Sequence, residues 1–220
     1  ALLLGFLAVL IVSIVILSCV PPVSKDALTH HLAIPKLYLQ HEGIYEIPFA
    51  RFSYYPMNLD LLYLTPLYFG NDIAPKFIHF GFALLTCWLI FGYIKRRTNL
   101  IYALFGVLFF LSIPIIVKLS ISVYVDLGLI FFSTASLLSL LKWIESNYQL
   151  RFLIISTVSC GLAMGTKYNS LVAFFLLTLF VPFVYSRYNQ AENPGLFKIV
   201  GHAVFFALIA LLVFSPWMIK

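Results

Sequence analysis

Residues 21–31 read PPVSKDALTHH, and they open a polar stretch, residues 21–76, that lies between two long apolar segments. This stretch holds five of the eight acidic residues and three of the five histidines, and a fourth histidine, His79, follows just after it. Most of the remaining chain is apolar. Because charged side chains are costly to place beside a bilayer, the chemistry of the protein is expected in this stretch.

The composition indicates a membrane protein. Of the residues, 62% are hydrophobic and only 10% are charged, whereas about a quarter are charged in a soluble domain. Apolar runs recur at about the 20 residues that a helix needs to cross a bilayer. We therefore predict an all-α, polytopic membrane protein. The net charge of +6 does not indicate nucleic acid as a partner, since no basic helix carries interleaved aromatic residues.

Seven apolar segments are expected to cross the membrane as helices. They are residues 1–20, 73–94, 100–117, 121–141, 150–166, 170–185 and 199–219. The first segment lacks the basic start and the cleavage site of a signal peptide, so a spanning helix is favoured. The connection 186–198 is polar, with a turn expected at Asn193-Pro194-Gly195. We expect residues 1–220 to form a single transmembrane domain that is a fragment of a longer chain.

Residues 21–76 are expected to form an outer loop with two amphipathic helices that lie on the membrane surface. Asp26 or Ser24 can cap the first helix, which runs to about His41. The second helix is expected from Pro56 to about Phe69, after which Gly70-Asn71-Asp72 breaks it and caps the next helix.

Charges near the ends of the apolar segments suggest an orientation and a site. Residues 95–97 read KRR, a tight basic cluster that favours the cytoplasmic side. Asp26, Asp126 and Lys167 then share the outer face, where two carboxylates and an ammonium group can form a site. Each charge could instead be an interfacial anchor. That alternative suits Asp126 least, because it lies inside an apolar run, one turn from the expected start of its span.

Three parts of the sequence resemble the GT-C superfamily of membrane glycosyltransferases, in the branch with the protein mannosyltransferases and the aminoarabinose transferases of lipid A. They are DALTHHL at 26–32; YP at 55–56 with LLYL at 61–64, FG at 69–70 and APKF at 74–77; and YVDL at 124–127 followed by GLAMGTKY at 161–168. The resemblance covers nearly the whole chain.

The resemblance implies a GT-C fold and a mannosyltransferase-like transfer in the cell envelope. A sugar would pass from a polyprenyl-phosphate carrier to a lipid, glycan or protein acceptor. The transfer is expected at the outer face of a bacterial plasma membrane. Asp26 matches the family's proposed general base, and Lys76 matches a basic residue usual at the start of the second span. The sequence departs from the family pattern in two places. Ala27 stands where many members have a second acidic residue, and Ser53-Tyr54-Tyr55-Pro56 stands where some relatives have a Lys-Pro-Pro step.

Cationic side chains are needed to hold the phosphate of the donor. Lys167, with Lys76 or Arg51, is expected to do so, although Arg51 could equally be a solvated loop charge. The other residues expected to contact substrate are Asp126, Tyr168 and His30.

No cofactor is expected, but two alternatives stay open. Asp26 and His30 are four residues apart, and with His31 they could bind a divalent metal; contact with lipid headgroups is the simpler interpretation. The alternative function is a polytopic transporter or lipid flippase, which forms no bond. Transporters tend to show internal repeats and broken spans near the midplane, and no repeat is visible here.

The orientation can be tested by labelling cysteines from outside the cell. A thiol introduced by Glu46→Cys, in the outer loop, is expected to react with an impermeant reagent, whereas one introduced by Thr98→Cys is not. The parent chain with its three native cysteines is the control. The reverse labelling pattern would overturn the orientation.

Overall fold

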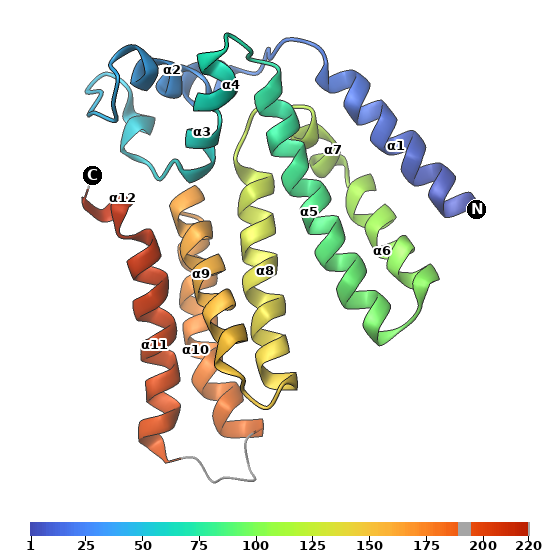
Figure 1. Ribbon diagram of the computed structural model, residues 1–220, viewed down its shortest axis with the longest axis vertical. Coiled ribbons are helices and arrows are strands. Elements are labelled where there is room, and N and C mark those ends of the chain that lie inside the picture. Colours follow the sequence, from blue (N-terminus) through green and yellow to red (C-terminus); the bar gives the residue numbers. More distant parts are fainter. Residues whose placement is uncertain (189–194, 220) are drawn as a thin grey trace. The chain divides into compact units, whose positions relative to one another are not determined.

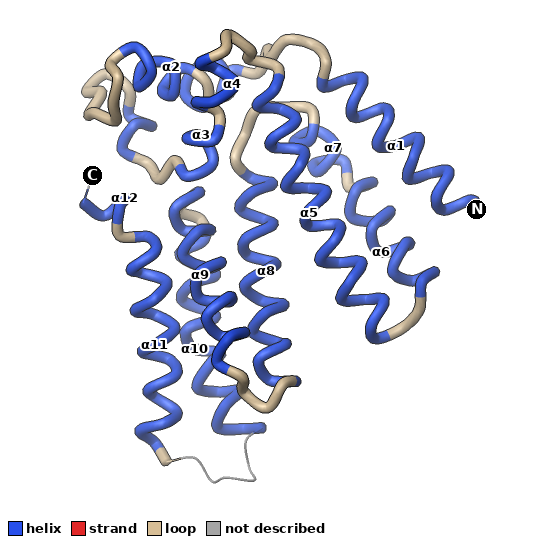
Figure 2. Tube along the Cα trace, viewed as in Figure 1, coloured by secondary structure: helices blue, strands red, loops and turns tan. Residues whose placement is uncertain are grey.

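A computed structural model describes residues 1–188 and 195–219, so Asn193 and Pro194 of the expected turn lie outside the described residues. In this described part, every regular element is a helix (Figures 1 and 2). The chain divides into two compact units, Ala1–Phe131 and Phe132–Lys220. The expectation of a single domain over 1–220 stays a prediction.

The first unit packs apolar helices beneath a group of short ones. Its elements are α1 (Leu2–Ser18), η1 (Ala27–His31), α2 (Ala33–Gln40), η2 (Arg51–Tyr54), α3 (Asn58–Leu62), α4 (Leu64–Tyr68), α5 (Ala74–Arg97), α6 (Leu100–Ser112), α7 (Pro114–Ser120) and the first turns of α8 (Asp126–Glu145). The long helix α5 packs against α6, α7 and α1 around buried Ile14, Phe80 and Leu111. Figure 1 shows α2, α3 and α4 gathered at the end of the unit where α5 begins.

The two expected surface helices are each broken. The first consists of η1, a π-helical turn in which the Leu32 N–H bonds to the carbonyl of Ala27, and then α2. The second is wrong as one helix from Pro56 to Phe69: it forms α3 and α4, separated at Tyr63. Pro66 has no N–H to donate to the preceding turn, which accounts for the break.

Of the two expected caps at the start of the outer loop, the structure uses Ser24. The Ala27 N–H donates to the Ser24 hydroxyl oxygen at 3.4 Å, and Asp26 makes no capping hydrogen bond. The carboxylate of Asp26 is therefore free to serve another purpose.

The prediction for residues 70–72 is confirmed. Gly70 has a φ of 72°, in the left-handed region that glycine tolerates, so the chain turns there. The Asn71 side-chain oxygen then accepts hydrogen bonds from the N–H groups of Ile73 and Ala74, each at 3.0 Å. This cap fixes the start of α5, and the first two turns of α5 carry two of the polar residues described below.

Among the residues that the structure describes, four helices are long and apolar enough to cross a membrane: α5, α8, α10 (Ser170–Tyr188) and α11 (Leu196–Phe214). The pair α6 and α7 could form a fifth span bent by 70°, and α1 and α9 (Leu150–Thr166) are shorter apolar helices. The protein is thus an all-α polytopic membrane protein, while the number of seven spans stays a prediction. The expected span 121–141 is helical only from Asp126 onward, since residues 121–125 form a loop.

The second unit contains the rest of α8 with α9, α10, α11 and α12 (Pro216–Ile219). Its helices α9, α10 and α11 pack against one another around the buried side chains of Trp143, Met164 and Phe206. Helices α9 and α11 approach closely at Gly161, where an added Cβ would lie only 2.6 Å from the Ala210 carbonyl oxygen. Small residues permit such close packing in membranes.

This close approach predicts that Gly161→Ala destabilises the second unit. The added methyl group has no space and forces α11 away, at a cost of about 1–3 kcal/mol for an overpacked site. The matched control is Gly201→Ala on α11, where a Cβ meets nothing within 4 Å. Thermal unfolding of the purified variants in detergent should show a lowered Tm for Gly161→Ala alone; equal Tm values would contradict the packing.

Candidate active site

The carboxylate of Asp26 is exposed and accepts a hydrogen bond from the phenol of Tyr124 at 3.3 Å. Tyr124 lies in the loop before α8, 98 residues further along the chain. The structure therefore brings the first polar segment of the outer loop into contact with the YVDL segment. Sequence reasoning assigned no role to Tyr124, although it lies only two residues before the candidate Asp126.

Tyr124 is held on both its backbone and its side chain. Its carbonyl accepts a hydrogen bond from the buried phenol of Tyr63, and its own hydroxyl also interacts with the hydroxyl of Ser24. Partial burial, followed by the negative charge of Asp26, raises the pKa of the Tyr124 phenol above its usual value. Tyr124 is therefore a protonated donor near neutral pH, and its phenol is directed to one carboxylate oxygen.

A second carboxylate, Asp60 on α3, pairs with His31 on η1. The His31 Nδ1 lies 2.7 Å from Oδ1 of Asp60, and the two residues are only 7% and 2% exposed. The His31 ring lies 5.5 Å from that of Tyr124. This pair ties η1 to α3.

Burial and the negative charge of Asp60 both act on the phenols near this pair. Burial, and then the charge of Asp60, raises the pKa of Tyr38 to about 12. The same two causes, with a smaller contribution from Asp126, raise the pKa of Tyr63 well above its usual value. Both phenols therefore stay protonated, and Tyr63 keeps its hydrogen bond to the Tyr124 carbonyl across the physiological pH range.

His30 and Arg51 lie together at a second place on the outer loop. The His30 ring stacks on Phe52 with centroids 4.2 Å apart, and its Nδ1 lies 3.1 Å from the hydroxyl of Thr29. Arg51 is exposed and lines, with Thr29 and Phe52, an open recess of about 380 Å³.

A metal at Asp26, His30 and His31 finds no support in this geometry. The three side chains are directed to different partners, namely Tyr124, Thr29 and Asp60. Within residues 1–188 and 195–219, no group of three or more His, Cys, Asp or Glu residues is placed to hold a metal ion. The expectation of no cofactor stays a prediction.

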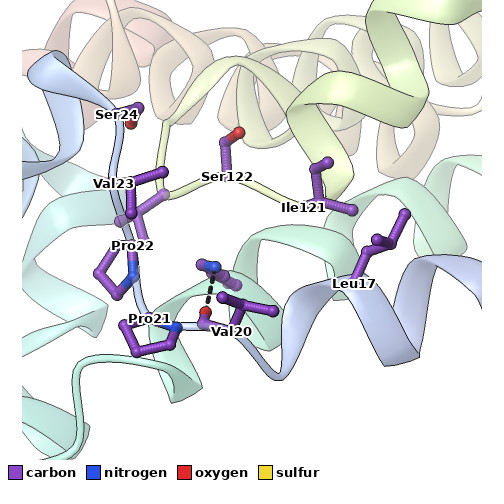
Figure 3. Close-up of a pocket in the computed structure, with 10 residues that line it drawn as sticks. Leu17, Val20, Pro21, Pro22, Val23, Ser24, Ile121 and Ser122 are labelled. Carbon is purple, nitrogen blue, oxygen red and sulfur yellow. Dashed lines mark hydrogen bonds between the residues drawn. The ribbon is translucent and has the colours of Figure 1, made fainter.

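Lys76 lies in the first turn of α5, and its ammonium group donates a hydrogen bond to the carbonyl of Val20, where the chain leaves α1. The side chain is only 4% exposed. It lines a recess of about 170 Å³ between residues 20–24 and 121–123, with mostly apolar walls and the hydroxyls of Ser24 and Ser122 (Figure 3). The recess adjoins the site because Ser24 belongs to both.

Asp126 is the first residue of α8 and is half-buried. The expectation that it lies within a span, one turn from its start, is therefore wrong. A carboxylate at this end interacts favourably with the helix dipole. Its charge adds to the raised pKa values of Tyr63 and Tyr124, so it belongs to the same cluster.

The two remaining candidates, Lys167 and Tyr168, belong to the second unit, where they follow α9. The carbonyl of Lys167 accepts hydrogen bonds from the N–H and the hydroxyl of Ser170. Tyr168 is exposed, and its ring meets Phe214 edge-on with centroids 6.4 Å apart. The first unit thus holds Asp26, Lys76 and Asp126 around Ser24 and Tyr124. It also holds His30 and Arg51 at the second place.

Besides Tyr124, two polar groups of this region, Asp60 and His79, were not identified from the sequence. Asp60 is one of five acidic residues in the outer loop, and nothing local marks it as the partner of His31. His79 lies in an apolar helix, and its three backbone contacts come from residues 40 to 48 positions away. His79 could have been identified from the sequence as a lone polar residue within an apolar run, since such residues are costly in a membrane.

These features define a class: an integral membrane protein that presents a carboxylate, a phenol and an ammonium group around the ends of its apolar helices. A family model described as dolichyl-phosphate-mannose-protein mannosyltransferase matches residues 67–219, more than half of the chain. The chain therefore belongs to this family, and it is a membrane glycosyltransferase of the GT-C type. Neither the curated proteins nor the solved structures contain a match.

The matched residues include Lys76, Tyr124 and Asp126 but begin after Asp26. The family assignment therefore rests on residues 67–219. Asp26 is a candidate through its geometry and its place after the first apolar helix.

The His31–Asp60 pair predicts that Asp60→Ala destabilises the first unit. Removing the carboxylate leaves the buried His31 ring without its partner, which costs about 1–3 kcal/mol for an unsatisfied buried group. The control is Glu46→Ala, which removes an exposed carboxylate of the same loop. Thermal unfolding and limited proteolysis of the outer loop measure the effect, and equal behaviour of the two variants would argue against a stabilising pair.

Proposed function

We propose that this protein transfers a sugar from a polyprenyl-phosphate carrier to a hydroxyl group of a lipid, glycan or protein acceptor, with Asp26 as the general base. The observation that carries the proposal is the exposed Asp26 carboxylate, which the Tyr124 phenol holds through one oxygen. Membership of a mannosyltransferase family supports the reaction class and the type of donor.

The reaction is an inverting displacement at the anomeric carbon of the sugar. The acceptor hydroxyl gives its proton to Asp26 while its oxygen forms the new bond to that carbon. The bond from the carbon to the phosphate oxygen breaks, and its electron pair leaves with the polyprenyl phosphate. The transition state resembles an oxocarbenium ion. An ionised carboxylate has about four lone-pair sites, so the bond from Tyr124 leaves room for the acceptor.

The phosphate of the carrier fits the recess beside Lys76. An ammonium group has three N–H donors, and Lys76 uses one of them on Val20. The apolar walls of residues 20–23 suit the first isoprene units, and Ser24 connects the recess to Asp26. We assign the leaving phosphate to Lys76, with Lys167 or Arg51 as a second cation.

The remaining candidates are assigned to the substrates around this centre. Asp126, close to Tyr63 and Tyr124, would orient the acceptor. His30 and Tyr168 would contact the sugar or the acceptor with their rings. The site is proposed to face the outer side of a bacterial plasma membrane, and no cofactor takes part in the reaction as written.

A transporter or flippase with the same helices would move the lipid-linked sugar without forming a bond. The family assignment favours the transferase. The two functions differ in their product, so an assay of glycosylated acceptor separates them from flipping of the carrier.

The decisive experiment is turnover of a polyprenyl-phosphate sugar by the purified full-length Asp26→Asn protein. The substitution keeps the shape of the side chain but removes its ability to accept the proton, and the helix cap is unaffected because Ser24 supplies it. Loss of a general base lowers the rate by about 10²–10⁴-fold.

The matched control is Glu46→Gln, which neutralises an exposed carboxylate of the same loop and is expected to keep full turnover. Both variants are checked for normal folding by their thermal unfolding. Turnover of Asp26→Asn near that of the parent would show that Asp26 is not the base.

A further inference from the structure

The buried imidazole of His79 connects three helices of the first unit. His79 lies in the second turn of α5 and is 0% exposed. Its Nδ1 lies 3.1 Å from the carbonyl oxygen of Leu119, on α7, and 3.0 Å from that of Ser122. Its Nε2 lies 3.0 Å from the backbone nitrogen of Leu127, on α8.

These partners determine the tautomer of the ring. Carbonyl oxygens only accept hydrogen bonds, so Nδ1 carries the proton and donates it to Leu119 and Ser122. A backbone N–H only donates, so Nε2 carries no proton and accepts from Leu127. His79 is therefore a neutral imidazole that uses both nitrogens on backbone groups, and neither nitrogen faces a substrate.

The contacts of His79 lie at both ends of segment 119–127. This segment includes the non-helical residues 121–125 between α7 and α8, and it carries Tyr124. Side chains from outside the segment hold its backbone in place. His79 binds it at each end, and Tyr63 donates a hydrogen bond to the Tyr124 carbonyl. The backbone groups that the imidazole holds all lie within five residues of Tyr124, so the position of the phenol depends on His79.

We propose that His79 is a positioning residue: by holding segment 119–127 it places the Tyr124 phenol on the carboxylate of the base. This inference rests on the proposed function, in which Asp26 is that base. His79 touches neither substrate nor Asp26, so it acts on the chemical step through the placement of Tyr124 and not through a contact of its own with donor or acceptor.

The test compares His79→Leu with Thr86→Val in the full-length protein. The first substitution removes all three contacts of the imidazole. The second removes a buried hydroxyl of the same helix that donates only within α5, to the Phe82 carbonyl. His79→Leu is expected to lower kcat about 10-fold, because one placed hydrogen bond at the reacting group is lost. Thr86→Val is expected to keep the kcat of the parent, even if its Tm falls as much as that of His79→Leu.

A double variant separates positioning from general damage. Tyr124→Phe removes the phenol and is expected to lower kcat by a similar factor. Adding His79→Leu to Tyr124→Phe should then lower kcat no further, since the group that His79 places is already absent. Effects that multiply to about 100-fold, or an unchanged kcat in His79→Leu, overturn the inference.

Hydrogen exchange supplies a readout that does not depend on the reaction. The amides of residues 121–127 are expected to exchange faster in His79→Leu than in Thr86→Val, and equal rates overturn the inference. If His79→Leu does not fold, His79→Gln carries the test. Its amide keeps one donor and one acceptor, so a smaller loss in kcat and the same non-additivity with Tyr124→Phe are expected.

The proposed function and the inference fail in different ways. Loss of turnover in Asp26→Asn, together with multiplying effects of His79→Leu and Tyr124→Phe, overturns the positioning role alone. Retained turnover in Asp26→Asn overturns both, because no base is then left to be placed.

Discussion

The hydrogen bond between Tyr124 and Asp26 joins the loop after α1 to the loop before α8. Other contacts within the first unit hold each of these loops in position. The chain leaving α1 is held where the Lys76 ammonium group binds the Val20 carbonyl. The loop before α8 is held where the His79 ring binds backbone groups on either side of Tyr124. Lys76 and His79 are three residues apart on α5, hence on one face of that helix. One helical face therefore supports both partners of the bond.

The cost of burying polar groups explains why these side chains are so completely engaged. In a setting with little water, an unpaired donor or acceptor loses its hydration without compensation. Asp60 meets His31, Tyr63 meets the Tyr124 carbonyl, and both nitrogens of His79 are used. The carboxylate of Asp26, by contrast, is exposed. Residues 21–76 thus combine a hydrogen-bonded polar cluster with an exposed carboxylate, an arrangement that suits the proposed proton abstraction from an incoming hydroxyl.

Membership of a mannosyltransferase family and the geometry of the site support each other, although they come from different residues. The family match covers the helices from residue 67 onward, including Lys76 and Tyr124. Asp26 lies outside that match, yet its carboxylate contacts Tyr124 within it. The proposed reaction needs a base next to a place for a lipid phosphate. Here the recess beside Lys76 and the carboxylate of Asp26 are joined through Ser24.

The sequence by itself determined the class of protein, because hydrophobicity and segment length decide which parts of a chain can enter a bilayer. It also singled out Asp26 as the candidate base and predicted the Gly70-Asn71 boundary, since both follow from neighbouring residues. Local pattern could not show that Ser24 rather than Asp26 caps the first turn, or that residues 121–125 leave the helix before Asp126. The partners of Asp26, His31 and His79 lie 29 to 98 positions away. Only tertiary packing brings such groups together, since hydrogen bonds between distant segments follow from how the helices pack and not from the order of residues.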